Sequence, residues 1–232
     1  MTFTENQKKN FHEFIIENDV IGFFQDPIEL KSGRLSYFYV NWRDITSDVY
    51  LIDRLTDYII QFAKELEFTR PCFLGVPEGA TKIGILTQFK WAKLQKDYGK
   101  NEYILSMARG KPKKHGALKD RAYVGIPQDD VIVIEDVTTT GQSLIKTIDQ
   151  LLELELNVIA AISLTNRDEK RSDGKTVEEI VQERGIPLKS MSHATELLPK
   201  VFEIKHKPNK KLARKIESYF NEYGIKPLNL RD

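Results

Sequence analysis

Four short apolar runs separated by helix-length segments constrain the fold of this chain more than any other feature. The runs span 72–76, 103–107, 131–135 and 158–164, and the helix-length segments lie near 80–96 and 142–155. Short continuous apolar runs are typical of strands that are buried on both faces. Their alternation with helices predicts an α/β fold with a central parallel sheet and right-handed crossovers. Ligands of such sheets bind at the carboxyl ends of the strands, so functional residues are expected just after the strands.

Local patterns predict further helices around this sheet. Residues 4–19 are polar and compatible with a helix. Apolar residues recur with a period of 3.6 over 50–66, which indicates an amphipathic helix packed on a core. Thr176 and Glu179 have the spacing of a capping box, and this pair predicts the start of another helix.

The chain is predicted to contain three parts and one mobile loop. The parts are an N-terminal helix and hood at 1–45, an α/β core at 46–205 and a C-terminal helix at 206–232. The loop at 109–121 is polar, carries Gly110, Pro112 and Gly116, and interrupts the strand pattern. Because it is also rich in lysine, we expect it to close over an anion.

Composition and charge exclude several classes of protein. A chain of 232 residues with 41% hydrophobic residues and a net charge of +1 is neither disordered nor broadly attractive to nucleic acids or anionic membranes. Cys72 is the only cysteine, which excludes an intrachain disulfide, and its apolar neighbours predict a buried strand residue. The first residues lack an apolar signal-peptide core, and no run approaches the roughly 18 apolar residues of a membrane span. The cytoplasm is therefore the expected location.

The segment Val131–Ser143 carries the most chemical information. It contains an apolar strand, the carboxylates Glu135 and Asp136, a threonine-rich turn with Gly141, and the start of a helix. A turn that leads into a helix N-terminus offers free N–H groups and hydroxyls to a phosphate. Carboxylates just before it suit sugar hydroxyls, or a magnesium ion bound to them. The alternative is an ordinary strand with solvated acids, followed by a capped helix.

These thirteen residues resemble the signature for 5-phosphoribosyl 1-diphosphate (PRPP) in type I phosphoribosyltransferases. The resemblance implies a Rossmann-like α/β core, with a central parallel sheet flanked by helices and a small N-terminal hood. A nucleoside-triphosphate loop would instead need a glycine-rich turn that ends in Gly-Lys-Ser or Gly-Lys-Thr, and the chain has no such sequence.

Three other segments, and an arginine that follows a strand, resemble the orotate branch of this family. Leu30–Arg34 is similar to the hood hairpin, which implies that Lys31 and the nearby Tyr39 line the base pocket. Arg167, at the end of a strand, matches an arginine that pairs with the orotate carboxylate, and a guanidinium fork suits that group. A turn with solvated charges and a surface ion pair are the respective alternatives.

The other two segments match loops that bind the pyrophosphate of PRPP. Leu74–Gly84 resembles the pyrophosphate loop, one residue longer than usual, and Lys82 matches the lysine of that loop. Met107–Gly116 resembles the flexible catalytic loop, which acts across a dimer interface. A surface lysine after a helix cap is the alternative for Lys82. The shift of Lys111 by one place from the family pattern leaves its role open.

The resemblance implies an orotate phosphoribosyltransferase of pyrimidine (UMP) biosynthesis that is a cytoplasmic homodimer. The PRPP site is then assigned to Lys82, Arg109, Lys113, His115, Glu135, Asp136, Val137, Thr138, Thr139, Thr140, Gly141, Gln142 and Ser143. The orotate site is assigned to Lys31, Tyr39, Thr139 and Arg167, and the catalytic residues to Arg109, Lys113, His115 and Asp136. Magnesium is expected as cofactor, held mainly through PRPP, with Glu135 and Asp136 as candidate ligands.

Two alternative functions stay open at this point. A phosphoribosyltransferase for another base would share the PRPP site, although a purine has no carboxylate for Arg167. A PRPP-binding regulator of nucleic acids would be expected to carry a basic face or an added DNA-binding domain. A two-function uridine monophosphate synthase is not expected, because 232 residues leave no room for a decarboxylase domain. Association with a separate decarboxylase stays open.

Overall fold

A parallel sheet forms the centre of the computed structural model, which describes residues 3–111, 113–206 and 209–230. The sheet has four strands in the order β3-β6-β7-β8, and every neighbouring pair is parallel. The strands are β3 (Pro71–Gly75), β6 (Asp130–Thr138), β7 (Val158–Asn166) and β8 (Leu188–Ser190). The predicted α/β class and parallel sheet are confirmed.

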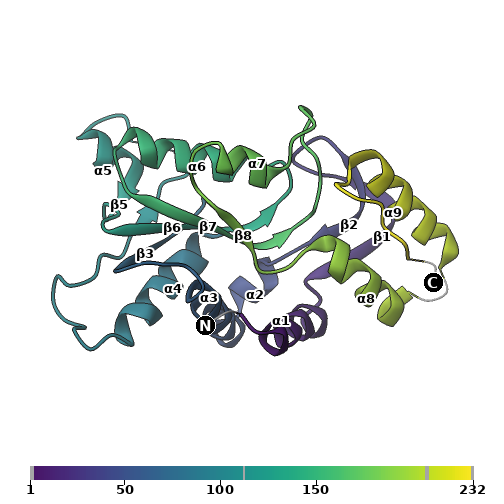
Figure 1. Cartoon of the computed structure of the whole chain (residues 1–232), viewed down its shortest axis with the longest axis horizontal. Coiled ribbons are helices and arrows are strands. Elements are labelled where there is room, and N and C mark those ends of the chain that lie inside the picture. Colours follow the sequence, from purple (N-terminus) through teal and green to yellow (C-terminus); the bar gives the residue numbers. More distant parts are fainter. Residues whose placement is uncertain (1–2, 112, 207–208, 231–232) are drawn as a thin grey trace.

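Helices cover both faces of this sheet (Figure 1). One face is covered by α6 (Gln142–Glu153) and α7 (Val177–Gln182), and the other by α1 (Glu5–Glu17), α3 (Val49–Ala63) and α4 (Thr81–Lys93). The predicted helices at 4–19, 50–66, 80–96 and 142–155 are therefore confirmed. The capping box of Thr176 and Glu179 begins α7, with both of its hydrogen bonds present. Cys72 is buried, as its apolar run indicates.

The prediction of a sheet strand at 103–107 is wrong. Only the two residues of β4 (Met107–Ala108) are extended, and they pair antiparallel with β5 (Tyr123–Val124) outside the central sheet. Tyr103 instead stacks on the guanidinium of Arg70 at 4.5 Å and donates to Asp97 at 2.6 Å. Because Leu105 is 49% exposed, the run does not have the burial on both faces that a central strand needs.

The predicted C-terminal helix is α9 (Lys210–Tyr223), which is shorter than the predicted segment at 206–232. A separate helix, α8 (Ala194–His206), precedes it. Residues 207–208 and 231–232 of that prediction lie outside the described residues, as does Pro112 of the predicted loop. The three-residue strand β8 and helix α8 have no counterpart in the predicted elements.

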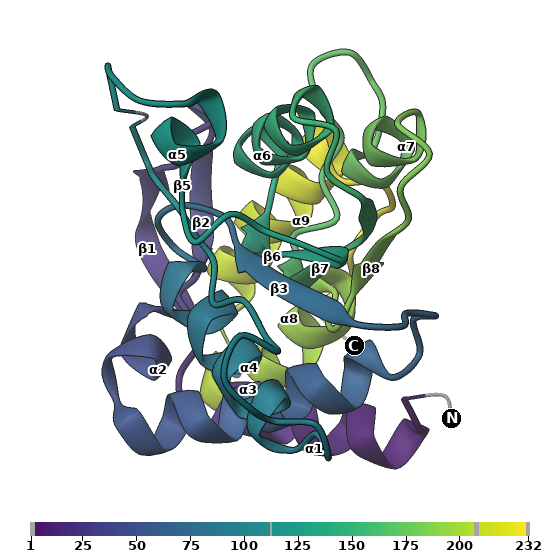
Figure 2. The same ribbon diagram turned by 90° about the vertical axis from the view of Figure 1, so that its left-hand side faces the viewer.

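The N-terminal hood consists of α1, a hairpin and a short helix. The hairpin is formed by β1 (Ile21–Glu29) and β2 (Leu35–Val40), which make a two-stranded sheet of their own, and α2 (Arg43–Ser47) follows. Helix α9 packs on β2, where Phe220 stacks on Phe38 with their ring centroids 5.7 Å apart. The hood strands and the segment with α5 (Leu118–Ala122) and β5 lie to the same side of the central sheet (Figure 2). None of the helices in the described ranges is long and apolar enough to cross a membrane.

Candidate active site

A cavity of about 720 Å³ lies at the carboxyl ends of β6 and β7. The hood, the loop after β3, the segment after β4 and the start of α6 all contribute to its wall. The predicted site residues that line it are Lys31, Tyr39, Arg109, Glu135, Asp136, Val137, Thr139, Thr140, Gly141, Gln142, Ser143 and Arg167. Its volume falls in the usual range of small-molecule sites. Residues that are far apart in the sequence therefore meet where a parallel sheet normally binds its ligand.

The turn before α6 has the backbone that an anion site requires. Gly141 is the N-cap of α6 and has a φ of 68°, and no side chain caps the helix start. A Cβ at position 141 would lie 2.1 Å from Cγ2 of Val177, so any side chain there would clash as well as strain the backbone. The first N–H groups of α6 and the positive end of its dipole thus face the cavity, as a phosphate would need.

Thr138 supports this turn from behind. It is the last residue of β6, it is fully buried, and its hydroxyl lies 3.1 Å from the hydroxyl of Ser163 on β7. Its carbonyl accepts a hydrogen bond from the Arg167 N–H at 2.9 Å. Thr138 is not among the cavity-lining residues, so it holds the turn in place rather than facing the cavity.

Glu135 and Asp136 lie within β6, because the strand continues past them to Thr138. Glu135 is 7% exposed, and burial together with the neighbouring Asp136 carboxylate raises its pKa well above the usual range. A Cβ on Gly79 would come within 2.5 Å of Asp136 Oδ2, so the loop after β3 packs directly against this carboxylate. Glu135 therefore needs a cation or hydroxyl donors nearby before its carboxyl group can be ionised without a large cost.

Lys31 reaches from the hood to the start of α6. Its Nζ donates to Ser143 Oγ at 3.2 Å, although the two residues are 112 positions apart. Gly33, with a φ of 79°, forms the tip of the hairpin, and its N–H donates to Leu30 O at 2.8 Å. The hairpin thus places an ammonium group next to the turn that precedes α6.

Arg167 is 2% exposed and has several partners inside the protein. Its Nε donates to Glu169 Oε1 at 2.7 Å, and its Nη2 donates to Ser36 Oγ at 3.0 Å. The guanidinium also lies 3.9 Å from the centre of the Phe38 ring. Arg167, which is predicted to bind a substrate carboxylate, is thus already paired with the carboxylate of Glu169. Its internal partners hold the guanidinium in one position at the wall of the cavity.

Besides Thr138, three predicted site residues do not line this cavity. Lys82 points toward α2, where its Nζ donates to Thr46 O at 3.1 Å. Lys113 and His115 are exposed, and neither is among the cavity-lining residues. The segment that carries them is held by its own hairpin contacts, such as Lys113 N to Arg121 O at 3.0 Å. The assignment of these side chains to PRPP stays a prediction.

Several residues of the site were not predicted. Arg171 donates from Nη1 to Thr140 O and so holds a carbonyl of the turn before α6. Glu169 accepts from both Arg167 and Arg34. The sequence contains a weak signal for Glu169, because it follows Arg167 by two residues, but the contacts themselves depend on the tertiary fold.

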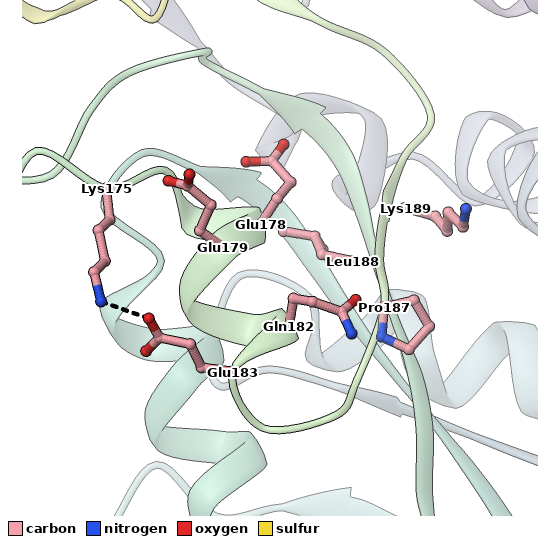
Figure 3. Close-up of a pocket in the computed structure, with 8 residues that line it drawn as sticks. All are labelled: Lys175, Glu178, Glu179, Gln182, Glu183, Pro187, Leu188 and Lys189. Atoms are coloured by element: carbon pink, nitrogen blue, oxygen red, sulfur yellow. Dashed lines mark hydrogen bonds and ion pairs between the residues drawn. The ribbon is translucent and has the colours of Figure 1, made fainter.

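A second pocket, of about 600 Å³, lies between α7 and β8 (Figure 3). It is lined by Lys175, Glu178, Glu179, Gln182, Glu183, Pro187, Leu188 and Lys189. Lys175 is paired with Glu183, so this wall carries mainly acidic groups with one internal ion pair. None of the residues predicted to bind substrate contributes to its wall among those described. The cavity next to α6 is therefore the candidate active site.

Comparison with known proteins agrees with this geometry. No protein-family model matches the chain. A curated orotate phosphoribosyltransferase from Aquifex aeolicus (strain VF5) is 31% identical over 177 residues, which cover 75% of this chain and 88% of the relative. A second, from Rhodopseudomonas palustris (strain BisB5), is 31% identical over 195 residues, 79% of this chain and 92% of the relative.

Solved structures share the fold. The crystal structure of an orotate phosphoribosyltransferase from Francisella tularensis superposes with a TM-score of 0.66 and 20% sequence identity, covering 93% of this chain and 99% of the other. The similarity in fold and the similarity in sequence thus both extend over most of the chain. This chain belongs to the orotate phosphoribosyltransferase family.

Proposed function

We propose that this protein transfers the phosphoribosyl group of PRPP to orotate, giving orotidine 5′-monophosphate and pyrophosphate in pyrimidine biosynthesis. The observation that carries this proposal is the contact of Lys31 Nζ with Ser143 Oγ at 3.2 Å. It joins the hood to the turn that suits a phosphate, so the base and the phosphoribosyl group would meet in one cavity. Family membership supports the choice of orotate as the base.

The turn before α6 would bind the 5-phosphate of PRPP. Its backbone N–H groups and the hydroxyls of Thr139, Thr140 and Ser143 supply donors at the positive end of the helix dipole. Glu135 and Asp136 would accept from the ribose hydroxyls. Binding at both points would fix the anomeric carbon relative to the base, which is the main requirement of a displacement reaction.

The donor set of the cavity fits a magnesium ion carried mainly by PRPP. Carboxylate oxygens are ligands that magnesium prefers, and the ion commonly keeps few protein ligands beside substrate phosphates. Asp136 lines the cavity beside Glu135, while no group of three or more metal-binding side chains occurs among residues 3–111, 113–206 and 209–230. Glu135 and Asp136 would hold the ion together with the substrate. Bound magnesium would neutralise charge on the pyrophosphate.

Displacement at the anomeric carbon would need no protein nucleophile. Orotate nitrogen would approach one face of the ribose while pyrophosphate leaves from the other. Arg109 lines the cavity, and it would stabilise the charge that gathers on the leaving group, with Lys82, Lys113 and His115 as further donors. Closure of the loop at 109–121 would exclude water that could hydrolyse PRPP.

We propose that the protein acts as a homodimer in which this loop serves the partner's cavity. Lys113 and His115 are exposed and do not contribute to the cavity of their own chain, which supports a role in a second copy. Large apolar side chains are also exposed at the start of α3, where Val49 is 84% and Tyr50 is 69% accessible. Contact with another subunit would cover them.

The decisive experiment follows the ultraviolet absorbance of orotate on mixing the purified protein with orotate, PRPP and magnesium. Adenine, hypoxanthine and uracil are tested in parallel. Turnover with orotate alone is the expected result. Turnover with a different base would refute the assignment of the base pocket. No turnover with any base, together with nucleic-acid binding by the same preparation, would favour a PRPP-binding regulator.

A further inference from the structure

A buried carboxylate behind the base pocket is shared by two arginines. Glu169 Oε1 accepts from Arg167 Nε and Glu169 Oε2 accepts from Arg34 Nη1, both at 2.7 Å. The Glu169 side chain is completely buried, and the side chains of Arg167 and Arg34 are 2% and 12% exposed. We propose that Glu169 is a positioning residue for the base site, which fixes Arg167 and the hood tip so that oriented positive charge faces a carboxylate on the base. This inference rests on the proposed function.

The contacts of Arg167 leave one edge of its guanidinium for a ligand. Glu169 occupies Nε, and Nη2 donates to Ser36 Oγ at 3.0 Å and to Tyr219 Oη at 3.4 Å. The bond from Nη1 to Phe38 O is long, at 3.4 Å, so Nη1 is the donor with the weakest internal partner. Since Arg167 lines the cavity, a carboxylate would meet Nη1 while Nε stays bound to Glu169 and Nη2 to Ser36. The base would therefore be held in one orientation.

The charge of the cluster favours an anionic base. Two guanidinium groups share one carboxylate, so the cluster carries one excess positive charge in a largely buried region. A buried charge without a full counter-charge is costly, and a carboxylate on the substrate would remove that cost. A neutral base of the same shape would leave the excess charge uncompensated. Glu169 thus reduces the charge to a value that one carboxylate can balance.

Arg34 connects the same carboxylate to the hood tip. It lies at the end of the hairpin turn, where Leu30 N donates to Arg34 O at 2.8 Å, and it is three residues after Lys31. Its Nη2 donates to Lys170 O at 2.5 Å, and its guanidinium lies 4.6 Å from the centre of the Tyr223 ring. Glu169 therefore positions the turn that carries Lys31 as well as Arg167.

Glu169 itself is fixed by the backbone around it. Lys170 N donates to Tyr223 O at 2.7 Å, and Ile225 N donates to Asp168 O at 2.9 Å. The segment that holds the carboxylate is thus paired with the end of α9, and Glu169 forms a bridge with Gly224. A carboxylate held on both sides of its backbone can serve as a rigid anchor for two mobile side chains.

The test compares Glu169→Gln with Asp168→Asn, a matched control. Asp168 is the neighbouring buried carboxylate, but its partners are Thr195 and His193 on the side of α8. We expect Glu169→Gln to raise KM for orotate about tenfold, because a hydrogen bond to a charged group is lost. KM for PRPP and the inhibition constant of uracil, which has no carboxylate, should stay within about twofold. Asp168→Asn should lower the melting temperature and leave both KM values within about twofold.

Selective loss of orotate affinity in Glu169→Gln, with partial recovery in Glu169→Asp, would support the proposal. An unchanged KM for orotate in folded Glu169→Gln, or an equal rise in both KM values, would overturn it. Should Glu169→Gln fail to fold, Ser36→Ala takes its place, with an expected rise of about threefold in KM for orotate alone. A wild-type protein that does not turn over orotate would overturn the proposed function itself, before any variant is compared.

Discussion

The turn at 138–143, which we propose binds the 5-phosphate of PRPP and call the phosphate-binding turn, and the loop at 109–121 differ in how the chain supports them. The turn joins a buried strand to α6, and Ser163, Arg167 and Arg171 all contact it. In the loop, residues 113–117 are all exposed, and the bonds that hold it run within the same hairpin, as from Arg121 Nε to Gly116 O at 2.6 Å. Both regions are expected to bind the same anionic substrate. We therefore expect the turn to be formed before the substrate arrives, and the loop to become ordered only when the substrate binds.

This difference indicates that the turn contributes mainly to the affinity for PRPP and the loop mainly to the rate of turnover. A turn that is held by neighbouring elements loses little conformational entropy when PRPP binds, so it can supply affinity. An exposed loop must be ordered at that moment, and its contribution is greatest when the substrate and the leaving group hold it closed. Substitutions in the two regions should therefore differ in kind as well as in size.

The largest expected effect comes from Gly141→Ala in the turn. The added Cβ would lie 2.1 Å from Val177 Cγ2, and the φ of 68° is unfavourable for alanine. We expect kcat/KM for PRPP to fall at least about a hundredfold. The variant should also lose about 1–3 kcal/mol of unfolding free energy in chemical denaturation.

Two controls sharpen this prediction. Adding Val177→Ala should restore part of the activity, because it removes the atom that the new Cβ would meet. Gly116→Ala in the loop also has a positive φ, of 106°, but no atom lies within 4 Å of its Cβ, so its effect on stability should be smaller. Equal losses at the two glycines would show that the turn is no better supported than the loop.

His115→Ala in the loop should reduce kcat about a hundredfold, because a proton donor to the leaving group is lost. The side chain is exposed, so the unfolding free energy should change by less than about 0.5 kcal/mol. Lys113→Ala should behave similarly. Steady-state kinetics and thermal unfolding on the same preparation test both. A large change in stability without a loss of kcat would rule out the catalytic assignment.

Mixing two inactive variants tests whether the loop acts in the partner subunit. Asp136→Asn removes a charge from the cavity, and His115→Ala removes the loop donor. In a mixed dimer with exchanged loops, one of the two sites combines an intact cavity with an intact loop. Activity should therefore return after the subunits are exchanged, up to about half of the wild-type value for each mixed dimer. No recovery in verified mixed dimers would mean that each loop serves its own chain.

A smaller effect is expected for Glu135→Gln, and its sign depends on pH. Burial raises the pKa of Glu135 in the folded protein above its usual value of 4.5, so the folded state holds a proton that the unfolded state releases. Stability contributed by this group is therefore lost as pH rises above about 4.5. The glutamine variant should be more stable than the wild type at neutral pH, on the order of 1 kcal/mol, and equal to it near pH 4. Denaturation at both pH values checks the sign.

The smallest effect concerns limited proteolysis. Trypsin should cut first after lysines in the loop, such as Lys113 and Lys114, because both are exposed. PRPP with magnesium should slow this cleavage if binding closes the loop, while orotate alone should not. Cleavage that is equally fast with and without PRPP would contradict the idea that the substrate completes this region.

Much of the sheet could be predicted because burial on both faces leaves a clear pattern. The strands β3, β6 and β7 are long enough to require continuous apolar runs. The strand β8 has three residues, Leu188–Ser190, and its sequence does not differ from that of a loop. The run at 103–107 has a composition similar to that of a strand, but Tyr103 packs on Arg70 and Leu105 is exposed. A short pattern cannot distinguish these cases.

The candidate site also contains a part that the sequence could predict and a part that it could not. The residues of the turn before α6 are consecutive in the sequence, so they could be identified from one continuous segment. The environment of Arg167 depends on the hood and α9, and Arg34 lies 135 positions away from its partner Glu169. Spacing along the sequence cannot reveal such contacts, because they are set by how separate elements pack. The exposed position of Lys113 and His115 outside the cavity has the same origin.

The pairing of residues 168–170 with the end of α9 has a consequence for synthesis of the chain. The elements that form the phosphate-binding turn all leave the ribosome before α9, whereas Tyr219 and Tyr223 of α9 contact Arg167 and Arg34. In a nascent chain, the phosphate-binding turn could therefore form before α9 is available to pack against Arg167 and Arg34. If PRPP and orotate bind as proposed, competence for PRPP would precede competence for orotate, because α9 follows the phosphate-binding turn in the sequence.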